Sequence, residues 1–309
     1  MEKPVIRISV RNLVEFILRN GDLESGGTAG DKEAMLKGSR LHRKIQKQMG
    51  SHYQAEVSLK KDTEYEDLIL RVEGRADGIF TQNEKICIDE IKGVYKNLEL
   101  LAEPVLVHRA QALCYAWIYL DDHGLEEIDV QMTYAHLDTE MIKRFRETMT
   151  REELESWYQR LLDSYHKWLS YQMKWREERN RSMEKLEFPF IYRKGQKEMV
   201  AGIYHAISRK EQIFIQAPTG VGKTMSAVFP AVRSIGEGKA ETLFYLTART
   251  ITRTVAQDAF EILRKNGLLF KTVTITAKEK LCFCEKPECN PETCPYAKGH
   301  YDRINDAVY

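Results

Sequence analysis

The chain has 309 residues, and since a domain usually holds about 100–200 residues, we expect about two domains. Hydrophobic residues make up 43% and charged residues 30%, a globular composition that argues against long disordered or collagen-like segments. The 47 basic and 46 acidic residues nearly cancel, so any surface that binds nucleic acid must be local.

No apolar run is long enough to cross a bilayer, and the segment from Met1 to Val10 lacks the apolar centre of an export signal. We therefore expect a cytoplasmic protein with no membrane partner. Its protein partners cannot be inferred from composition.

The first part of the chain mixes helix-forming and strand-forming segments. Helical apolar spacing or strand-forming residues predict these elements in order: helices over 9–20 and 31–49, strands over 53–60, 67–72, 75–80 and 85–92, a helix over 103–121, and a strand over 127–136. This order predicts an α/β domain over residues 1–140, in which helices cover a sheet.

Residues 141–185 favour a helical linker, because Leu154, Trp157 and Leu161 begin a stripe at helical spacing. From residue 186 onward, short apolar runs alternate with helical segments. The expected elements there are helices over 193–208, 223–236 and 250–265, and strands over 212–216, 242–247 and 271–276. Such alternation predicts βαβ units and a parallel sheet in a domain over 186–309.

Residues 217–224 read Ala-Pro-Thr-Gly-Val-Gly-Lys-Thr, after an apolar run and before a helical segment. This is the context of a phosphate-binding loop, whose backbone N–H groups and helix N-terminus attract phosphate oxygens. Lys223 can reach the β- and γ-phosphates, and the Thr224 hydroxyl can bind Mg²⁺. We therefore predict that ATP binds at Thr219, Gly220, Gly222, Lys223 and Thr224.

The loop resembles the Walker A motif of superfamily-two helicases. The upstream segment Tyr192-Arg193-Lys194-Gly195-Gln196 resembles the adenine-reading Q motif, and Leu246-Thr247-Ala248-Arg249-Thr250 resembles motif Ia, which touches the DNA backbone. The resemblance implies a RecA-like motor domain in which Gln196 contacts the adenine and Arg249 contacts DNA.

Four of the six cysteines lie within 13 positions near the C-terminus: Cys282, Cys284, Cys289 and Cys294. A tight cluster without an export signal indicates a metal site rather than a disulfide framework. Four thiolates suit zinc or an iron–sulfur cluster, and the spacing alone does not choose between them. A helicase P-loop followed by such cysteines resembles the XPD/DinG family, which implies a [4Fe-4S] cluster in an insertion over 275–300.

Two acidic residues and a lysine lie on neighbouring predicted strands of the first domain. Asp77 and Glu90 can converge on a hard divalent cation, Mg²⁺ or Mn²⁺, and His42 on a helix could supply a further ligand. Lys92 points to the same strand face as Glu90 and can orient a water molecule. Each residue alone is also typical of ordinary structure, but charges that interrupt an apolar strand are costly unless they are paired.

Together with Gly38, Gly74 and the pair Gln111 and Tyr115 on the next helix, these residues resemble the RecB-type PD-(D/E)xK nucleases. The resemblance implies that His42, Asp77 and Glu90 bind metal, with help from the Ile91 carbonyl. It also implies that Lys92 is catalytic and that Gln111 and Tyr115 position a DNA strand. Asp89 beside Glu90 leaves open which carboxylate faces the metal.

After Thr224 no apolar run ends in Asp-Glu, so the Walker B pair of a motor is missing, as is room for a second motor domain. We therefore expect the front portion of a longer protein, with exposed apolar surface and without ATP turnover of its own. The whole protein would be an ATP-dependent DNA helicase with a metal-dependent nuclease, acting on single-stranded or forked DNA in repair or processing. The alternatives are an inactive nuclease fold that only grips DNA, and a zinc-containing P-loop ATPase acting on RNA.

Overall fold

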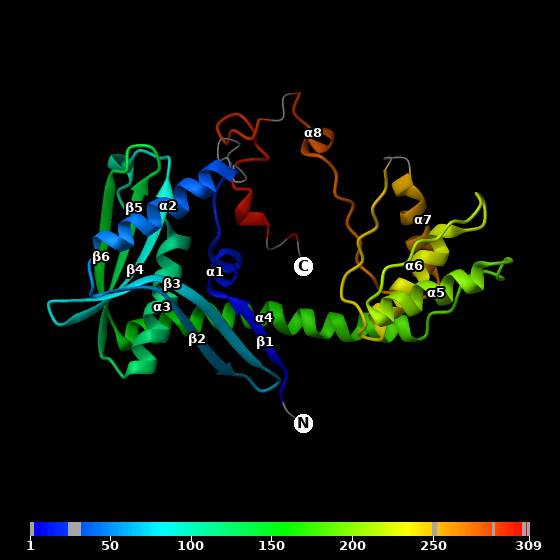
Figure 1. Ribbon diagram of the computed structural model, residues 1–309, viewed down its shortest axis with the longest axis horizontal. Coiled ribbons are helices and arrows are strands. Elements are labelled where there is room, and N and C mark those ends of the chain that lie inside the picture. The colour runs from blue at the N-terminus through cyan, green and yellow to red at the C-terminus, as the bar shows by residue number, and fades with distance from the viewer. Residues whose placement is uncertain (1–2, 24–31, 249–251, 286–287, 305–306, 308–309) are drawn as a thin grey trace. The chain divides into compact units, whose positions relative to one another are not determined.

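The computed structural model describes residues 3–23, 32–248, 252–285, 288–304 and 307 (Figure 1). The chain divides into two compact units. The first unit comprises Met1–His166 and Ala277–Tyr309, and the second unit comprises Lys167–Thr276. None of the described helices is long and apolar enough to cross a membrane.

The first unit is an α/β structure with one mixed sheet. Its elements in chain order are β1 (Val5–Ser9), α1 (Val10–Leu18), α2 (Lys32–Gln48), β2 (Tyr53–Glu64), β3 (Ile69–Gln82), β4 (Lys85–Val94), η1 (Leu98–Leu100), α3 (Leu106–His123), β5 (Glu127–His136), β6 (Ile142–Thr150), the first half of α4 (Arg151–Glu184), α8 (Lys278–Leu281) and η2 (Tyr301–Arg303). The strand order is β1-β3-β4-β5-β6, and β2 pairs with β3.

Strand β3 is long and changes partners along one of its sides. Residues Ile69 to Glu73 pair in parallel with β1, and residues Gly78 to Gln82 pair antiparallel with β4. Strand β2 runs antiparallel along the other side of β3. The four residues between these two pairings include Asp77, so the predicted metal ligand lies where β3 leaves one partner and meets the next.

The two faces of β4 meet different helices. Ile91 packs against Leu41 and Ile45 of α2, whereas the Lys92 ammonium donates to Gln111 of α3. Successive side chains of a strand point to opposite faces, so the alternation along β4 separates a packed face from a polar one. The sheet is therefore covered by helices on both faces, as the α/β prediction requires.

The first unit differs from the expected elements in three ways. Strand β3 is continuous where two strands were expected over 67–72 and 75–80, and β1 was not expected. Residues 142–150, which we expected to be helical, form strand β6 because they pair with β5 at the sheet edge. Helix α4 begins only after Thr150, whose backbone N–H donates to Glu153 at 2.9 Å while its hydroxyl accepts from the Glu153 N–H at 3.3 Å.

The second unit contains the rest of α4 and the helices α5 (Gln196–Arg209), α6 (Lys223–Gly236) and α7 (Thr252–Lys265), as the periodicity predicted. Side chains from α4, α6 and α7, including Met183, Val232 and Leu263, form its core.

The strands expected over 212–216, 242–247 and 271–276 are not formed, and the described residues of the second unit contain no strand. Phe214, Leu246 and Ile275 in these segments are 94%, 88% and 88% exposed. Parallel strands need paired neighbours and covered faces, and neither is present here. The expectation of exposed apolar surface is confirmed.

A glycine in β3 is expected to be essential for the packing of the first unit. A Cβ atom at Gly78 would lie 1.8 Å from the Tyr53 ring, which also donates to Asp89 at 3.1 Å. We expect Gly78→Ala to lower the free energy of unfolding by about 1–3 kcal/mol or more, because the ring must move. Gly38→Ala in α2 is the matched control, since its Cβ would meet no atom within 4 Å. The control should gain about 0.5–1 kcal/mol in urea denaturation, and equal stability of the two variants would contradict this account.

Candidate active site

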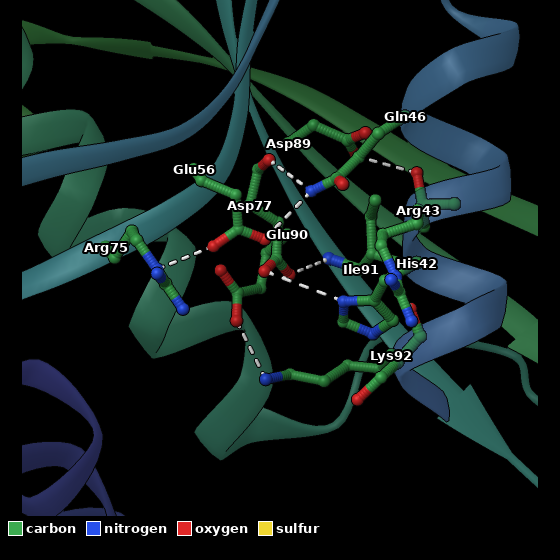
Figure 2. A network of polar contacts seen from close by, with 12 residues as sticks. His42, Arg43, Gln46, Glu56, Arg75, Asp77, Asp89, Glu90, Ile91 and Lys92 are labelled. Carbon is green, nitrogen blue, oxygen red and sulfur yellow. Dashed lines mark hydrogen bonds and ion pairs between the residues drawn. The ribbon is translucent and has the colours of Figure 1, made fainter. Parts of the chain in front are cut away.

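Asp77 is held where β3 changes partners. Its Oδ2 accepts a hydrogen bond from the Ile91 N–H at 2.7 Å, so the carboxylate takes the place of a strand partner (Figure 2). Its Oδ1 lies 3.7 Å from Nδ1 of His42 on α2. The Gln46 amide, one turn further along α2, donates to the Asp77 carbonyl at 3.0 Å. These contacts fix the Asp77 side chain between the sheet and α2.

Glu90 is the most deeply buried acid of the predicted site. Its Oε1 accepts from the Lys92 ammonium at 2.7 Å, and that ammonium also donates to Gln111 Oε1 at 2.6 Å. Glu90 is 5% exposed, and its other oxygen, Oε2, is buried without a hydrogen-bond partner. An acceptor left in this state is unfavourable, and a hard cation is a natural partner for it.

Burial raises the pKa of Glu90 to about 7, the neighbouring Lys92 opposes this rise, and the Asp77 charge adds to it. The carboxylate is therefore close to its protonation midpoint near neutral pH. A perturbed acid beside a charged partner is a common property of catalytic sites.

Asp89 points to the opposite face of β4. Its carboxylate accepts from the Thr133 hydroxyl at 2.6 Å, from the Gln131 amide at 3.1 Å and from the Tyr53 hydroxyl at 3.1 Å. All of these partners are buried, so Asp89 is a satisfied core residue. Glu90, and not Asp89, lies with Lys92.

Tyr115 supports the strand that carries Asp77. Its hydroxyl hydrogen-bonds to the backbone of Arg75, and burial raises its pKa. A Cβ at Gly74 would lie 2.7 Å from the Tyr115 hydroxyl oxygen, so only glycine leaves room for this contact. Tyr115 therefore acts on the site indirectly, by holding the backbone of β3 near Asp77.

Three residues of this network were not predicted from the sequence: Gln46, Glu56 and Arg75. Glu56 accepts from Gln46 at 3.1 Å and pairs with Arg75 at 2.6 Å (Figure 2). Gln46 could have been found, because it follows His42 by one helical turn. Glu56 carries no sequence signal, since its place depends on a backbone conformation that only the folded strand pair reveals.

Among the described residues, no group of three or more His, Cys, Asp or Glu side chains is arranged as a complete metal site. The structure brings His42 and Asp77 together and places Glu90 with Lys92 and Gln111. Metal ligation by His42, Asp77 and Glu90 therefore stays a prediction.

The cysteine segment belongs to the first unit. The Sγ atoms of Cys284 and Cys294 lie 3.9 Å apart, and Cys289 Sγ lies 3.4 Å from the Lys278 ammonium. Hydrogen bonding to the backbone of Ala297 lowers the pKa of Cys294, which favours the thiolate. Two of the four predicted ligands, Cys284 and Cys294, are thus close together, and Cys282 is near Cys284.

The predicted phosphate-binding loop of the second unit lies directly before helix α6, without the expected strand over 212–216. Gly220 and Gly222 have φ values of 80° and 78°, in the left-handed region that glycine adopts readily. The Lys223 ammonium donates to the carbonyls of Ala217 and Pro218 at 3.0 and 2.8 Å, so it folds over the loop that precedes it. Thr219 lies in the same exposed loop, before helix α6.

Gln196 connects helix α5 to this loop. Its Oε1 accepts from the Arg193 N–H at 2.7 Å, and its amide donates to the Val221 carbonyl at 2.7 Å. Gln196 therefore braces the loop from a buried position. Thr224 lies 3.5 Å from the Tyr245 hydroxyl, and Arg249 lies outside the described residues.

The raised pKa of Glu90 makes a prediction about stability without metal. The folded state holds the Glu90 proton more tightly than the unfolded state, whose ordinary value is 4.5, so this group lowers stability as pH rises toward about 7. We expect the advantage of Glu90→Gln over the parent to grow by ~2.5 kcal/mol between about pH 5 and pH 8. The attraction of Lys92 for the ionised carboxylate is already included in this folded-state pKa, so any other cost of the substitution shifts the curve without changing its slope.

Urea unfolding in the presence of EDTA measures this difference at each pH. The control is Glu64→Gln, because hydrogen bonding to Lys3 lowers the pKa of the exposed Glu64 carboxyl. The control should give a small trend of the opposite sign. A Glu90→Gln advantage that does not change with pH would contradict the burial argument.

Known proteins resemble parts of this chain. Residues 193–285, less than half of the chain, match the family model of the DEAD/DEAH box helicase. Over 49 residues, the chain is 43% identical to the Probable ATP-dependent helicase MJ0942 of Methanocaldococcus jannaschii. That alignment covers 16% of this chain and only 7% of the helicase. A solved structure described as the crystal structure of SSO0001 covers 50% of this chain and 75% of its own, at 18% identity and a TM-score of 0.34.

The matched region contains the phosphate-binding loop and Gln196. The match to this family model implies ATP binding in the matched region. The partial helicase region therefore lies in the C-terminal part of an α/β chain whose sheet is mixed.

Proposed function

We propose that the first unit is a metal-dependent DNA nuclease of the RecB type, joined to the front part of an ATP-dependent DNA helicase. The observation that carries this proposal is the buried Glu90 carboxylate. One of its oxygens is bound to Lys92 and the other has no partner. A folded protein keeps such a group at a cost, and a function in the site would explain why it is kept.

The donor set fits a hard divalent cation, because it combines the unpartnered Glu90 oxygen with the Asp77 carboxylate and the His42 ring. Mg²⁺ or Mn²⁺ held by these groups and the Ile91 carbonyl would polarise a phosphate and acidify a water. Lys92, fixed by Glu90 and Gln111, would orient that water and stabilise negative charge. Gln111 would hold Lys92 and Tyr115 would hold β3, so that these two residues help to position the DNA strand.

The second unit would supply nucleotide binding to a RecA-like motor. Gln196 and the left-handed glycines would hold the loop so that it accepts phosphates, and Lys223 would move from the loop carbonyls to the ATP. The exposed apolar segments around Phe214, Leu246 and Ile275 are those that a complete motor sheet would bury. The whole protein would act on single-stranded or forked DNA in repair or processing, with Arg249 contacting the strand.

Four thiolates from Cys282, Cys284, Cys289 and Cys294 would hold a [4Fe-4S] cluster, as the resemblance to XPD/DinG helicases implies. The donor set fits, since the Sγ atoms of Cys284 and Cys294 already lie 3.9 Å apart and thiolates are the usual ligands of such clusters. Cys289 would leave its contact with Lys278 to complete the set.

Lys92→Ala tests the nuclease. With Mn²⁺ and a labelled single-stranded oligonucleotide, we expect the cleavage rate to fall by about 100-fold or more, because the group that orients the water is lost. Lys60→Ala on the exposed part of β2 is the control and should cut as the parent does. If Lys92→Ala cuts as fast as the parent, the activity does not come from this site. The alternative of an inactive nuclease fold that only binds DNA is then favoured.

Anaerobic purification tests the cluster. We expect a brown protein with a broad band near ~400 nm and iron matched by sulfide. Cys294→Ser should lose the colour, whereas Cys114→Ser, a buried cysteine of α3, should keep it. A colourless protein with one zinc would contradict the proposed cluster and favour the zinc-containing P-loop ATPase.

A further inference from the structure

Glu56 has an unusual backbone conformation directly opposite Asp77. The pairings Ala55 with Gly78 and Val57 with Ala76 flank this position, and the pair between them is missing from the ladder. Glu56 has a φ of 59°, in the left-handed region that non-glycine residues rarely adopt. Such strain persists only where neighbouring groups hold it, and it is concentrated at functional sites.

Two neighbours hold the Glu56 carboxylate. The Gln46 amide donates to its Oε1 at 3.1 Å and also to the Asp77 carbonyl at 3.0 Å, so one side chain ties both residues to α2. The Nε of Arg75 lies 2.6 Å from the other carboxylate oxygen. Glu56 is therefore held beside Arg75, and Figure 2 shows the contact between the two side chains.

Arg75 is held at its backbone and at its Nε atom, but its side chain remains exposed to solvent. Tyr115 bonds to its backbone and Glu56 binds its Nε, yet its side chain is 64% exposed. A guanidinium has five N–H donors in a rigid plane, so donors remain after one contact. Arg75 and Asp77 lie two positions apart on the same strand and share a face.

We propose that Arg75 binds a backbone phosphate of the DNA strand that is cut, and that Glu56 is a positioning residue that presets its guanidinium. The proposal rests on the nuclease function proposed above. The Asp77 carboxylate repels the phosphates of DNA, and the exposed guanidinium of Arg75, two residues away on the same strand, can offset this repulsion. A planar guanidinium binds two phosphate oxygens at once, and its fixed position reduces the entropy lost on binding.

Binding of a fluorescein-labelled single-stranded oligonucleotide tests this directly. All variants carry Lys92→Ala, and Ca²⁺ replaces Mg²⁺, so that cleavage does not disturb the measurement. We expect Arg75→Gln to weaken binding about 10-fold at low salt and to reduce the slope of log K against log salt by ~0.7, as for one lost phosphate contact. Arg75→Lys should keep the slope but recover only part of the affinity, because it loses the bidentate geometry.

Arg71→Gln is the matched control. Arg71 lies on the same strand and face. Its Nε and Nη2 atoms donate to the two carboxylate oxygens of Asp62, at 2.7 and 2.6 Å. It should leave affinity and slope unchanged. If Arg75→Gln matches this control and unfolds at the same urea concentration as the parent, the proposal is overturned.

Glu56→Gln tests the positioning role through a double-mutant cycle. If Glu56 acts through Arg75, the double variant should bind DNA no more weakly than Arg75→Gln alone. Fully additive losses of affinity would overturn this role.

The parent chain is also tested for cleavage of DNA. If it cuts no DNA, but Arg75→Gln still weakens DNA binding and reduces the salt dependence, the proposed nuclease is refuted and the phosphate contact is retained.

Discussion

The pairing of Glu90 with Lys92 is the interaction on which the first unit depends. A carboxylate in the middle of a buried strand is unstable without a cation, and Lys92, two residues further along, supplies one at 2.7 Å. Gln111 fixes the lysine from α3, so the strand, the helix and the charge pair form one network. The unpartnered oxygen of Glu90 is the part of this network that stability alone does not explain.

The course of β3 then decides where the rest of the site lies. Because the strand leaves β1 before it meets β4, Asp77 can turn its carboxylate to the Ile91 N–H. Two tyrosines fill the spaces beside the glycines of this strand, Tyr115 at Gly74 and Tyr53 at Gly78. The strand that carries the acidic residue is thus locked by the same packing that stabilises the sheet.

The second unit has local order in its helices but lacks the long-range pairing of a sheet among its described residues. Helix α6 and its loop depend on a short-range signal, the two left-handed glycines, and on one tertiary contact, the hydrogen bond from Gln196 to Val221. The apolar segments that should become strands lie exposed, because no pairing partner covers them. Nucleotide binding can therefore be argued from the loop, while motor activity requires a sheet that these residues do not form.

The sequence by itself predicted most of the helices, most strands of the first unit and the glycine-rich loop before α6, and it singled out Asp77, Glu90, Lys92 and Gln111 as candidate site residues. Periodicity and short motifs are local properties, so they survive without knowledge of the fold. Strand β6 and the missing strands of the second unit depend on pairing between distant segments, which composition does not reveal. The same holds for the choice of Glu90 over Asp89 and for the contacts of Glu56 and Arg75, because the face of β4 and the left-handed turn of β2 exist only in the assembled sheet.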